Sequence, residues 1–200
     1  MSLYSWKELL TQWNKEILES ESREFLSPEV IASKWIGYPG ATEPQIAQAE
    51  ERLGRKLPPS YREFLKFSNG WGMTTSFIDK LWSVEEIEWY AARHQELIDA
   101  WRLGRRHYFE SKPIPDTEYF IYGERQNPGI FRDEYLQTAL EISDIGDSAL
   151  YLLNPQVATE DGEWEAWFFA SWLPGANRHR SFWELMQAEY ERFLSLKDQG

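Results

Sequence analysis

Carboxylate side chains are the groups in this sequence whose spacing could do chemistry. Asp144 and Asp147 follow Glu141 within a few residues, and clustered carboxylates are the ligands that a hard cation such as Ca²⁺ prefers. The turn lacks the Asp-x-Asp-x-Asp-Gly order of a calcium-binding loop, and aspartates are ordinary residues of hairpin turns. We therefore predict that this turn binds no metal.

A second group of carboxylates lies in the sequence Glu-Asp-Gly-Glu-Trp-Glu at residues 160–165. An Asp-Gly pair between two strand-like segments predicts a hairpin loop. The loop is either a solvated turn or a contact surface for a basic partner, because carboxylates attract Lys and Arg and speed the encounter. The acidic candidates for partner contact are Asp144, Asp147, Glu160, Asp161, Glu163 and Glu165.

Other reactive groups do not combine into a recognisable active site. The chain has no cysteine, no Gly-x-Ser-x-Gly turn and no phosphate-binding loop. His94 is expected on the apolar side of a helix, where a buried, hydrogen-bonded role is favoured over a catalytic base. His107 and His179 lie beside arginines, and three scattered histidines do not form a His-x-x-x-His zinc pair. The sequence therefore predicts a non-enzymatic protein with no catalytic residue, no metal and no cofactor.

Short strands and amphipathic helices are predicted around these turns. The apolar run at 149–153 predicts a central strand. Residues 163–172 alternate, with Glu163, Glu165 and Trp167 facing away from the other side chains of that strand. A further strand is predicted at 118–122. Helices are predicted at residues 5–20, 43–53, 59–68, 84–103 and 182–196. Four of them begin with a predicted capping box, formed by Ser5 and Glu8, Thr42 and Gln45, Ser83 and Glu86, and Ser181 and Glu184.

The stretch from Gly40 to Gly72 holds the most specific local signals. Thr42 precedes the first of its two helices, and Gly54 suits the left-handed residue that often ends a helix. Two prolines separate the helices, and Asn69-Gly70 closes the second one with residues that tolerate positive φ. Nearly every residue in the stretch therefore has a role in capping, turning or packing.

This stretch resembles the helical motif of the SUKH superfamily. The residues that carry the resemblance are Ile46, Leu53-Gly54, Leu57-Pro58, Tyr61, Phe64-Leu65 and Asn69-Gly70, in that order. The stretch from about Glu141 to Leu194 is also similar, so the resemblance covers roughly residues 38–196. The superfamily includes the yeast cell-wall-assembly regulator and bacterial immunity proteins that neutralise toxins.

The resemblance and the order of the elements imply one fold class and two parts of the chain. The fold is expected to be α+β, with a small antiparallel sheet and helices packed on one face. Residues 37–200 are predicted to form the SUKH-like domain. Residues 1–36 lie outside the resemblance and are predicted to be an N-terminal helical extension, whose apolar stripe packs on the domain.

Charge and composition restrict the partners. The formal net charge is −12, from 33 acidic and 21 basic residues, and this excess repels nucleic acids and anionic membranes. The same field attracts a basic protein. No apolar run of about 18 residues is present to span a membrane, and the N-terminus lacks the pattern of a signal peptide. A cysteine-free chain fits a reducing compartment, so we expect a cytoplasmic protein.

These observations predict a protein-binding module, namely an immunity protein that binds a cognate, basic toxin domain. One alternative is a regulatory scaffold of the cell-wall-assembly type, which the lack of a long low-complexity tail disfavours. The other is a carbohydrate-binding protein that uses exposed Trp71, Trp82 and Trp167. Trp71 follows the Asn-Gly turn directly and is predicted to be exposed there, so it is also a candidate partner contact.

Overall fold

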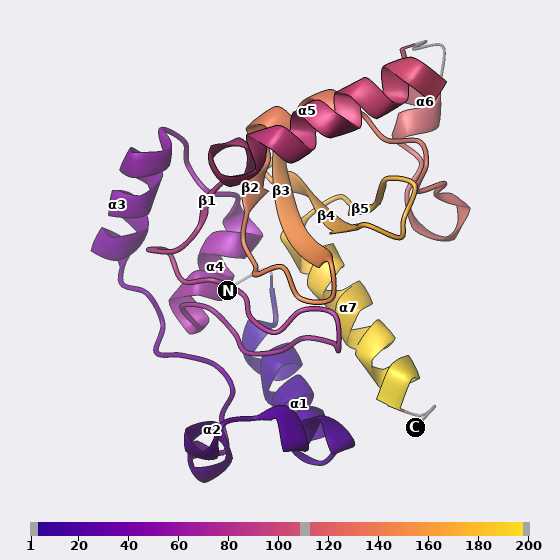
Figure 1. The fold of residues 1–200 in the computed structure, drawn as a ribbon. Coiled ribbons are helices and arrows are strands. Elements are labelled where there is room, and N and C mark those ends of the chain that lie inside the picture. The colour runs from indigo at the N-terminus through magenta and orange to yellow at the C-terminus, as the bar shows by residue number, and fades with distance from the viewer. Residues whose placement is uncertain (1–3, 109–112, 198–200) are drawn as a thin grey trace.

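A five-stranded antiparallel sheet lies at the centre of the computed structural model, which describes residues 4–108 and 113–197, with the side chains of 105–108 excepted (Figure 1). The strands follow one another in chain order, so each pairs with its neighbour in sequence. They are β1 (Glu88–Trp89), β2 (Leu140–Glu141), β3 (Ala149–Ala158), β4 (Trp164–Ala170) and β5 (Ala176–His179). β3 is the central strand, as its apolar run predicts.

Both faces of the two long strands are apolar. Tyr151 of β3 and Phe168 of β4 belong to the larger core cluster, on one face. Leu152 and Trp167, their neighbours along the chain, belong to a second cluster on the opposite face. Since successive side chains of a strand point to opposite faces, this sheet needs cover on both sides.

Helices supply that cover on both faces. α1 (Trp6–Leu18), α4 (Pro59–Phe67) and α7 (Phe182–Lys197) pack into the larger cluster. α5 (Tyr90–Tyr108) packs on the other face, together with the 3-10 helix η3 (Asp133–Thr138) (Figure 1). The predicted α+β class is confirmed, but helices cover both faces of the sheet and not one, because α5 packs on the face opposite α1, α4 and α7.

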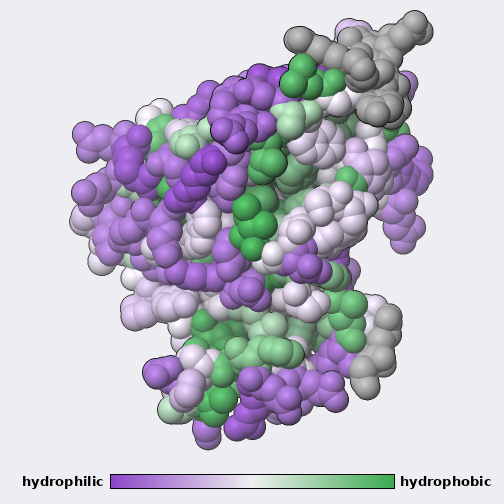
Figure 2. Space-filling model, viewed as in Figure 1, coloured by the Kyte–Doolittle hydropathy of each residue, from purple (hydrophilic) through white to green (hydrophobic). Residues whose placement is uncertain are grey.

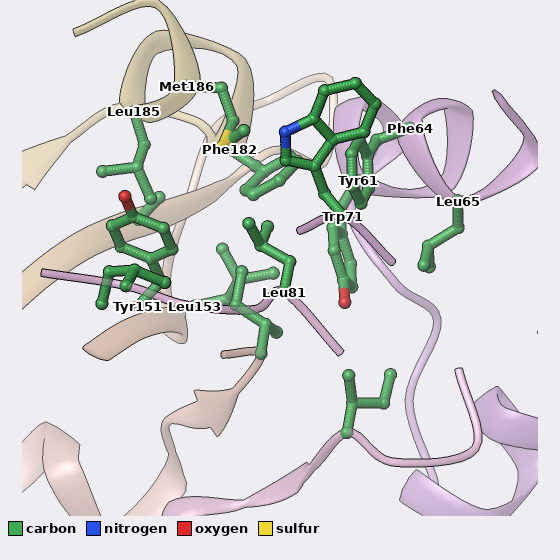
Figure 3. Packing of buried hydrophobic residues seen from close by; sticks show 14 of the residues in the cluster. Tyr61, Phe64, Leu65, Trp71, Leu81, Tyr151, Leu153, Phe182, Leu185 and Met186 are labelled. Atoms are coloured by element: carbon green, nitrogen blue, oxygen red, sulfur yellow. The ribbon is translucent and has the colours of Figure 1, made fainter. Parts of the chain in front are cut away.

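The motif at 40–72 forms the predicted helix pair, α3 (Glu43–Leu53) and α4. Thr42 and Gln45 make the reciprocal capping box, and Gly54 takes a φ of 67° at the end of α3. Buried Glu50 ties the corner between the helices, because its carboxylate accepts the backbone N–H of Leu57 at 3.0 Å and pairs with Arg62. Figure 3 shows the second helix contributing Tyr61, Phe64 and Leu65 to the core, near Phe182 of α7.

The segment before the motif packs against α4 and α7. α1 buries Trp6, Leu10, Trp13 and Ile17 in the larger cluster. It begins at Trp6, but Ser5 makes no side-chain capping bond, so the predicted Ser5–Glu8 capping box is absent. η1 (Glu21–Phe25) and α2 (Pro28–Ser33) follow. The boundary between residues 36 and 37 stays a prediction.

Two predicted elements differ from the structure, one in its bounds and one in its type. The helix predicted at 84–103 begins only at Tyr90, because β1 pairs with β2 just before it, and it is interrupted at His94 by non-helical backbone angles. The strand predicted at 118–122 is instead the short helix α6 (Asp116–Tyr119), followed by η2 (Gly123–Arg125). The alternation of Tyr119 with Ile121 was misleading, because Tyr119 lies in a helix that packs on the sheet, where its ring stacks with Arg178 of β5.

Candidate partner-binding surface

The two acidic turns lie at opposite ends of the longest strand. The turn at 144–148 precedes β3, and the hairpin at 159–162 follows it. A strand rises about 3.3 Å per residue, so the ten residues of β3 separate the turns by roughly 30 Å. The structure therefore does not bring the acidic candidates into one surface, and the two ends are separate candidates.

The loop between α4 and β1 holds the turn at 144–148 in place. The backbone N–H of Asp147 donates to the carbonyl of Phe77 at 3.1 Å, and that of Asp144 donates to the carbonyl of Lys80 at 3.0 Å. Glycine is required between them, because a Cβ at Gly146 would lie 1.9 Å from the carbonyl oxygen of Phe77. The turn and the loop therefore form one continuous surface.

The two aspartates of this turn have different roles. The Asp144 carboxylate accepts the backbone N–H of Lys80 at 3.0 Å, and burial raises the pKa of Asp144 above its ordinary value. Asp144 therefore fastens the turn to the loop. Asp147 is exposed and is the aspartate of the pair that a partner can readily reach.

Apolar side chains lie beside Asp147 at this end of the sheet. Trp172, just after β4, is 48% exposed, and its ring packs on Phe77 with centroids 5.3 Å apart. Ile145, in the same turn as Asp147, is 47% exposed. A backbone hydrogen bond of 3.0 Å from Ser171 to Ser148 joins the two segments. We call Phe77, Ile145, Asp147 and Trp172 the Trp172 patch.

The Trp172 patch has the composition of an interface anchor. Tryptophan is the residue most enriched among the few side chains that dominate binding energy in protein interfaces. Sequence reasoning missed Trp172, because it ends the alternating run at 163–172 and resembles the other aromatic residues there. The signal that could have found it is Pro174-Gly175, which breaks the strand and turns the chain at this point.

The hairpin at the other end presents two of its predicted carboxylates. Glu160 and Asp161 are exposed, and the turn closes at Gly162 with a φ of 89°. The Thr159 hydroxyl accepts the backbone N–H of Glu163 at 3.0 Å and donates to the Asp161 carboxylate. The predicted hairpin loop is therefore present, and contact between Glu160, Asp161 and a partner stays a prediction.

Glu163 is buried, so the expectation that it faces a partner is wrong. Its carboxylate accepts the backbone N–H and the hydroxyl of Ser60, each at 2.6 Å, and the hydroxyl of Tyr4 at 2.5 Å. Ser60 lies in the first turn of α4, where a negative charge is favourable next to unpaired backbone N–H groups. Glu163 therefore fastens the hairpin to α4.

Glu165 is also buried, and it is the centre of a polar cluster on the α5 side of the sheet. Its carboxylate accepts hydrogen bonds from Tyr119 (2.7 Å), Tyr122 (2.8 Å), Asn154 (3.1 Å), Trp167 (2.7 Å) and Arg178 (3.3 Å). The Arg178 guanidinium also stacks on the ring of Tyr119, 4.1 Å from its centroid. A buried charge is tolerated only when it is paired and hydrogen-bonded in this way. Glu165 thus fixes α6 to the sheet and is not a partner contact.

The tryptophans that suggested carbohydrate binding do not form a sugar platform. Trp71 and Trp167 are 0% exposed, so the prediction that they lie on the surface is wrong for both. Figure 3 shows the Trp71 indole inside the core with Tyr61 and Leu81 nearby. Trp82 is half-buried, with the guanidinium of Arg93 4.2 Å from its ring centroid. The carbohydrate-binding alternative therefore lacks the exposed tryptophans on which it depended.

The described histidines and carboxylates do not gather around a common point. Within the described residues, no group of three or more such side chains could hold a metal ion. His94 bonds Glu141 at 3.1 Å through Nε2, and burial raises the pKa of that carboxyl group. His94 is thus a hydrogen-bonded structural residue, as its position in the sequence predicts. His107 lies among the side chains that the structure does not describe.

The helix pair α3–α4, the meander and the final helix occur together in one known family. The chain matches the SMI1/KNR4 family (SUKH-1) over residues 40–195. It belongs to the SUKH-1 family. The resemblance predicted from the motif is therefore confirmed, and α1, η1 and α2 precede the region shared with other SUKH-1 proteins. No curated protein matches this SUKH-1 chain. In the part of the chain that the structure describes, no helix is long and apolar enough to cross a membrane.

Proposed function

We propose that this SUKH-1 protein is an immunity protein that binds a cognate toxin domain and blocks its activity. Family membership carries the proposal, because the SUKH-1 family includes immunity proteins. The net charge of −12 supports a basic toxin, since opposite charges raise the rate of encounter. Inhibition by surface contact requires no cofactor.

We place the main contact at the Trp172 patch. It combines an exposed indole with the exposed carboxylate of Asp147, and Asp79 on the adjoining loop is also exposed. A basic partner would bury the aromatic group at the centre and pair its Lys or Arg side chains with the carboxylates at the edge. The hairpin at 159–162 has exposed carboxylates but, among its own residues, no exposed aromatic side chain.

The first experiment is co-expression with the toxin domain encoded beside this gene. We expect the two proteins to co-purify and the toxin to lose its activity. Trp172→Ala should weaken the complex by about 30-fold or more, the loss typical of a central interface residue. Leu97→Ala is the matched control, because Leu97 is 50% exposed on α5, away from the patch. Absence of both binding and protection with any neighbouring toxin would remove the basis of the proposal.

Charge reversal then separates the two acidic ends. Asp147→Lys should slow association and reduce the dependence of affinity on salt, because it places a cation beside a basic partner. Glu160→Lys makes the same change at the other end of β3 and should have little effect. If Glu160→Lys slowed association and Asp147→Lys did not, the interface would lie at the hairpin, and the proposed immunity function would still hold.

A further inference from the structure

A groove of about 460 Å³ opens between η1 and the C-terminal end of α7. Leu196, which is 38% exposed, and the almost fully buried Phe193 line it from α7, and the exposed residues Glu19 and Glu21 line it from the η1 side. Ser76 completes the lining from the loop between α4 and β1. Three segments that are far apart in the sequence therefore meet at this groove.

The groove adjoins the Trp172 patch. Ser76 lines the groove, and the next residue, Phe77, packs on Trp172. Figure 1 shows this loop running between α1 and the sheet toward α7. A partner that binds Trp172 would therefore also reach the groove, because the two adjoin on the same surface.

The wall formed by η1 is fixed in place before any partner binds. Ile17, at the end of α1, is fully buried in the core. The Ser20 hydroxyl accepts the backbone N–H of Ser22 at 3.2 Å and donates to the carbonyl of Ile17 at 2.9 Å. The Lys197 ammonium, a cation at the groove, is paired with Glu16 at 2.6 Å and links α7 to α1. A preformed site loses less entropy when it binds a ligand.

The lining matches the two chemical parts of a cationic side chain. Lysine and arginine carry an apolar stem and a charged end, and they bury the stem on apolar surface while the charge faces polar groups. In this groove the stem would lie on Phe193 and Leu196, and the charge would face Glu19 and Glu21. An anionic or a purely apolar side chain would satisfy only one part of this lining.

We propose that the groove receives a lysine or arginine side chain of the protein partner. The inference rests on the proposed function for the identity of that partner. Glu19 and Glu21 lie outside the region that matches the family, residues 40–195. The N-terminal extension would therefore add a contact of its own to the family's fold, and it would help determine which toxin is bound.

A short peptide tests the groove without a toxin. Isotope-labelled protein is titrated with an acetylated, amidated Gly-Arg-Gly peptide and followed by NMR, with Gly-Glu-Gly and Gly-Leu-Gly as matched probes. We expect saturable shifts of the amides at 19–22, 76 and 193–196 with the arginine peptide only. The double variant Glu19→Gln/Glu21→Gln should weaken this binding at least 5-fold. Glu24→Gln is the control, because Glu24 is exposed in the same short helix and does not line the groove.

Each other outcome has a defined meaning. Shifts spread evenly over the exposed carboxylates, or equal binding by the double variant, would overturn the inference. Shifts at the same amides that grow with protein concentration alone would assign the groove to a second copy of the chain, which also overturns it. If the arginine peptide binds in the groove but the co-expression experiment finds no toxin that the protein binds or inhibits, the ligand class of the groove is established and the proposed function is contradicted. Unchanged melting temperatures of the variants verify that they are folded.

Discussion

His179 of β5 is a half-buried titratable residue that belongs to neither candidate surface. Its Nε2 is buried and has no hydrogen-bond partner among the described residues. Burial lowers the pKa of His179 to about 4, and the nearby Arg192 guanidinium acts in the same direction. The folded protein therefore holds this imidazole neutral at pH values where the unfolded chain protonates it.

This difference predicts a loss of stability in acid. The unfolded chain binds the extra proton below pH 6.5, so the free energy of unfolding falls as the pH drops from 6.5 toward 4. A difference of this size corresponds to about 2–3 kcal/mol at pH 4.5. The His179→Gln variant should lack the decrease in unfolding free energy that His179 causes, whereas the decrease caused by protonation of the carboxylates remains. Urea denaturation of the original protein and the variant at pH 7 and pH 4.5 measures the two decreases in unfolding free energy. Equal decreases in the two proteins would contradict the role given to His179.

Single residues were the hardest feature to predict from the sequence. Glu160 and Glu165 belong to the same acidic stretch, yet one is exposed and the other is buried in the cluster around Arg178. The alternation of the strand placed Glu165 on the correct face, but that face is covered by α5 and α6 instead of water. Whether a strand position meets solvent depends on segments distant in sequence, which local patterns do not reveal.

At the scale of elements, the outer edge of β5 is protected by a side chain. Gln126 accepts the backbone N–H of Arg178 at 2.7 Å through Oε1 and donates to its carbonyl at 2.7 Å through Nε2. These are the two hydrogen bonds that another strand would make. The carbonyl of Pro128 accepts the N–H of Ala176 at 3.2 Å and protects the next outward position. An unprotected edge is a template for pairing between chains.

Gln126→Ala should therefore expose this edge. We expect a loss of about 1–2 kcal/mol of stability, because two hydrogen bonds to the backbone disappear. We also expect self-association that increases with concentration, measured by light scattering after size-exclusion chromatography. Gln137→Ala is the control, since the side-chain amide of Gln137 bonds the exposed side chain of Gln95 on α5 instead of a strand backbone. A monomeric Gln126→Ala variant at high concentration would show that the loop protects the edge without this side chain.

Elements whose capping and turn residues lie within a few positions of one another were predicted well. Elements whose position depends on contacts with residues distant in sequence were not. The capping box at Thr42 and the glycine after α3 are complete within a few residues, so the sequence predicts α3 closely. α6 has no such signals inside it. Its position depends on Arg132, which bonds the Asp116 carboxylate at 2.5 Å, and on stacking of Tyr119 with Arg178. Both partners lie far along the chain.

At the scale of the whole molecule, the N-terminal extension covers apolar surface that the family region would otherwise expose. Figure 2 shows mainly hydrophilic residues over α3, whereas apolar residues gather in the middle of this face and again in its lower part, near α2. Beneath that surface, Trp13 packs on Tyr190 and Phe193 of α7, and Trp6 donates to the carbonyl of Ser60 in α4 at 3.1 Å. The extension therefore contacts both helices that form the lower side of the core.

We predict that a chain beginning at residue 37 does not fold stably by itself. Burial of the four core side chains of α1 contributes roughly 6–12 kcal/mol, which is comparable to the total stability of a typical domain. Circular dichroism and NMR of the truncated chain should show lost tertiary structure. Addition of a separate peptide of residues 4–36 should restore it, because the missing surface is then supplied in trans. A stably folded truncated chain would instead establish residues 37–200 as an independent domain. The role of the extension would then be to form the η1 side of the groove, and the domain would fold without it.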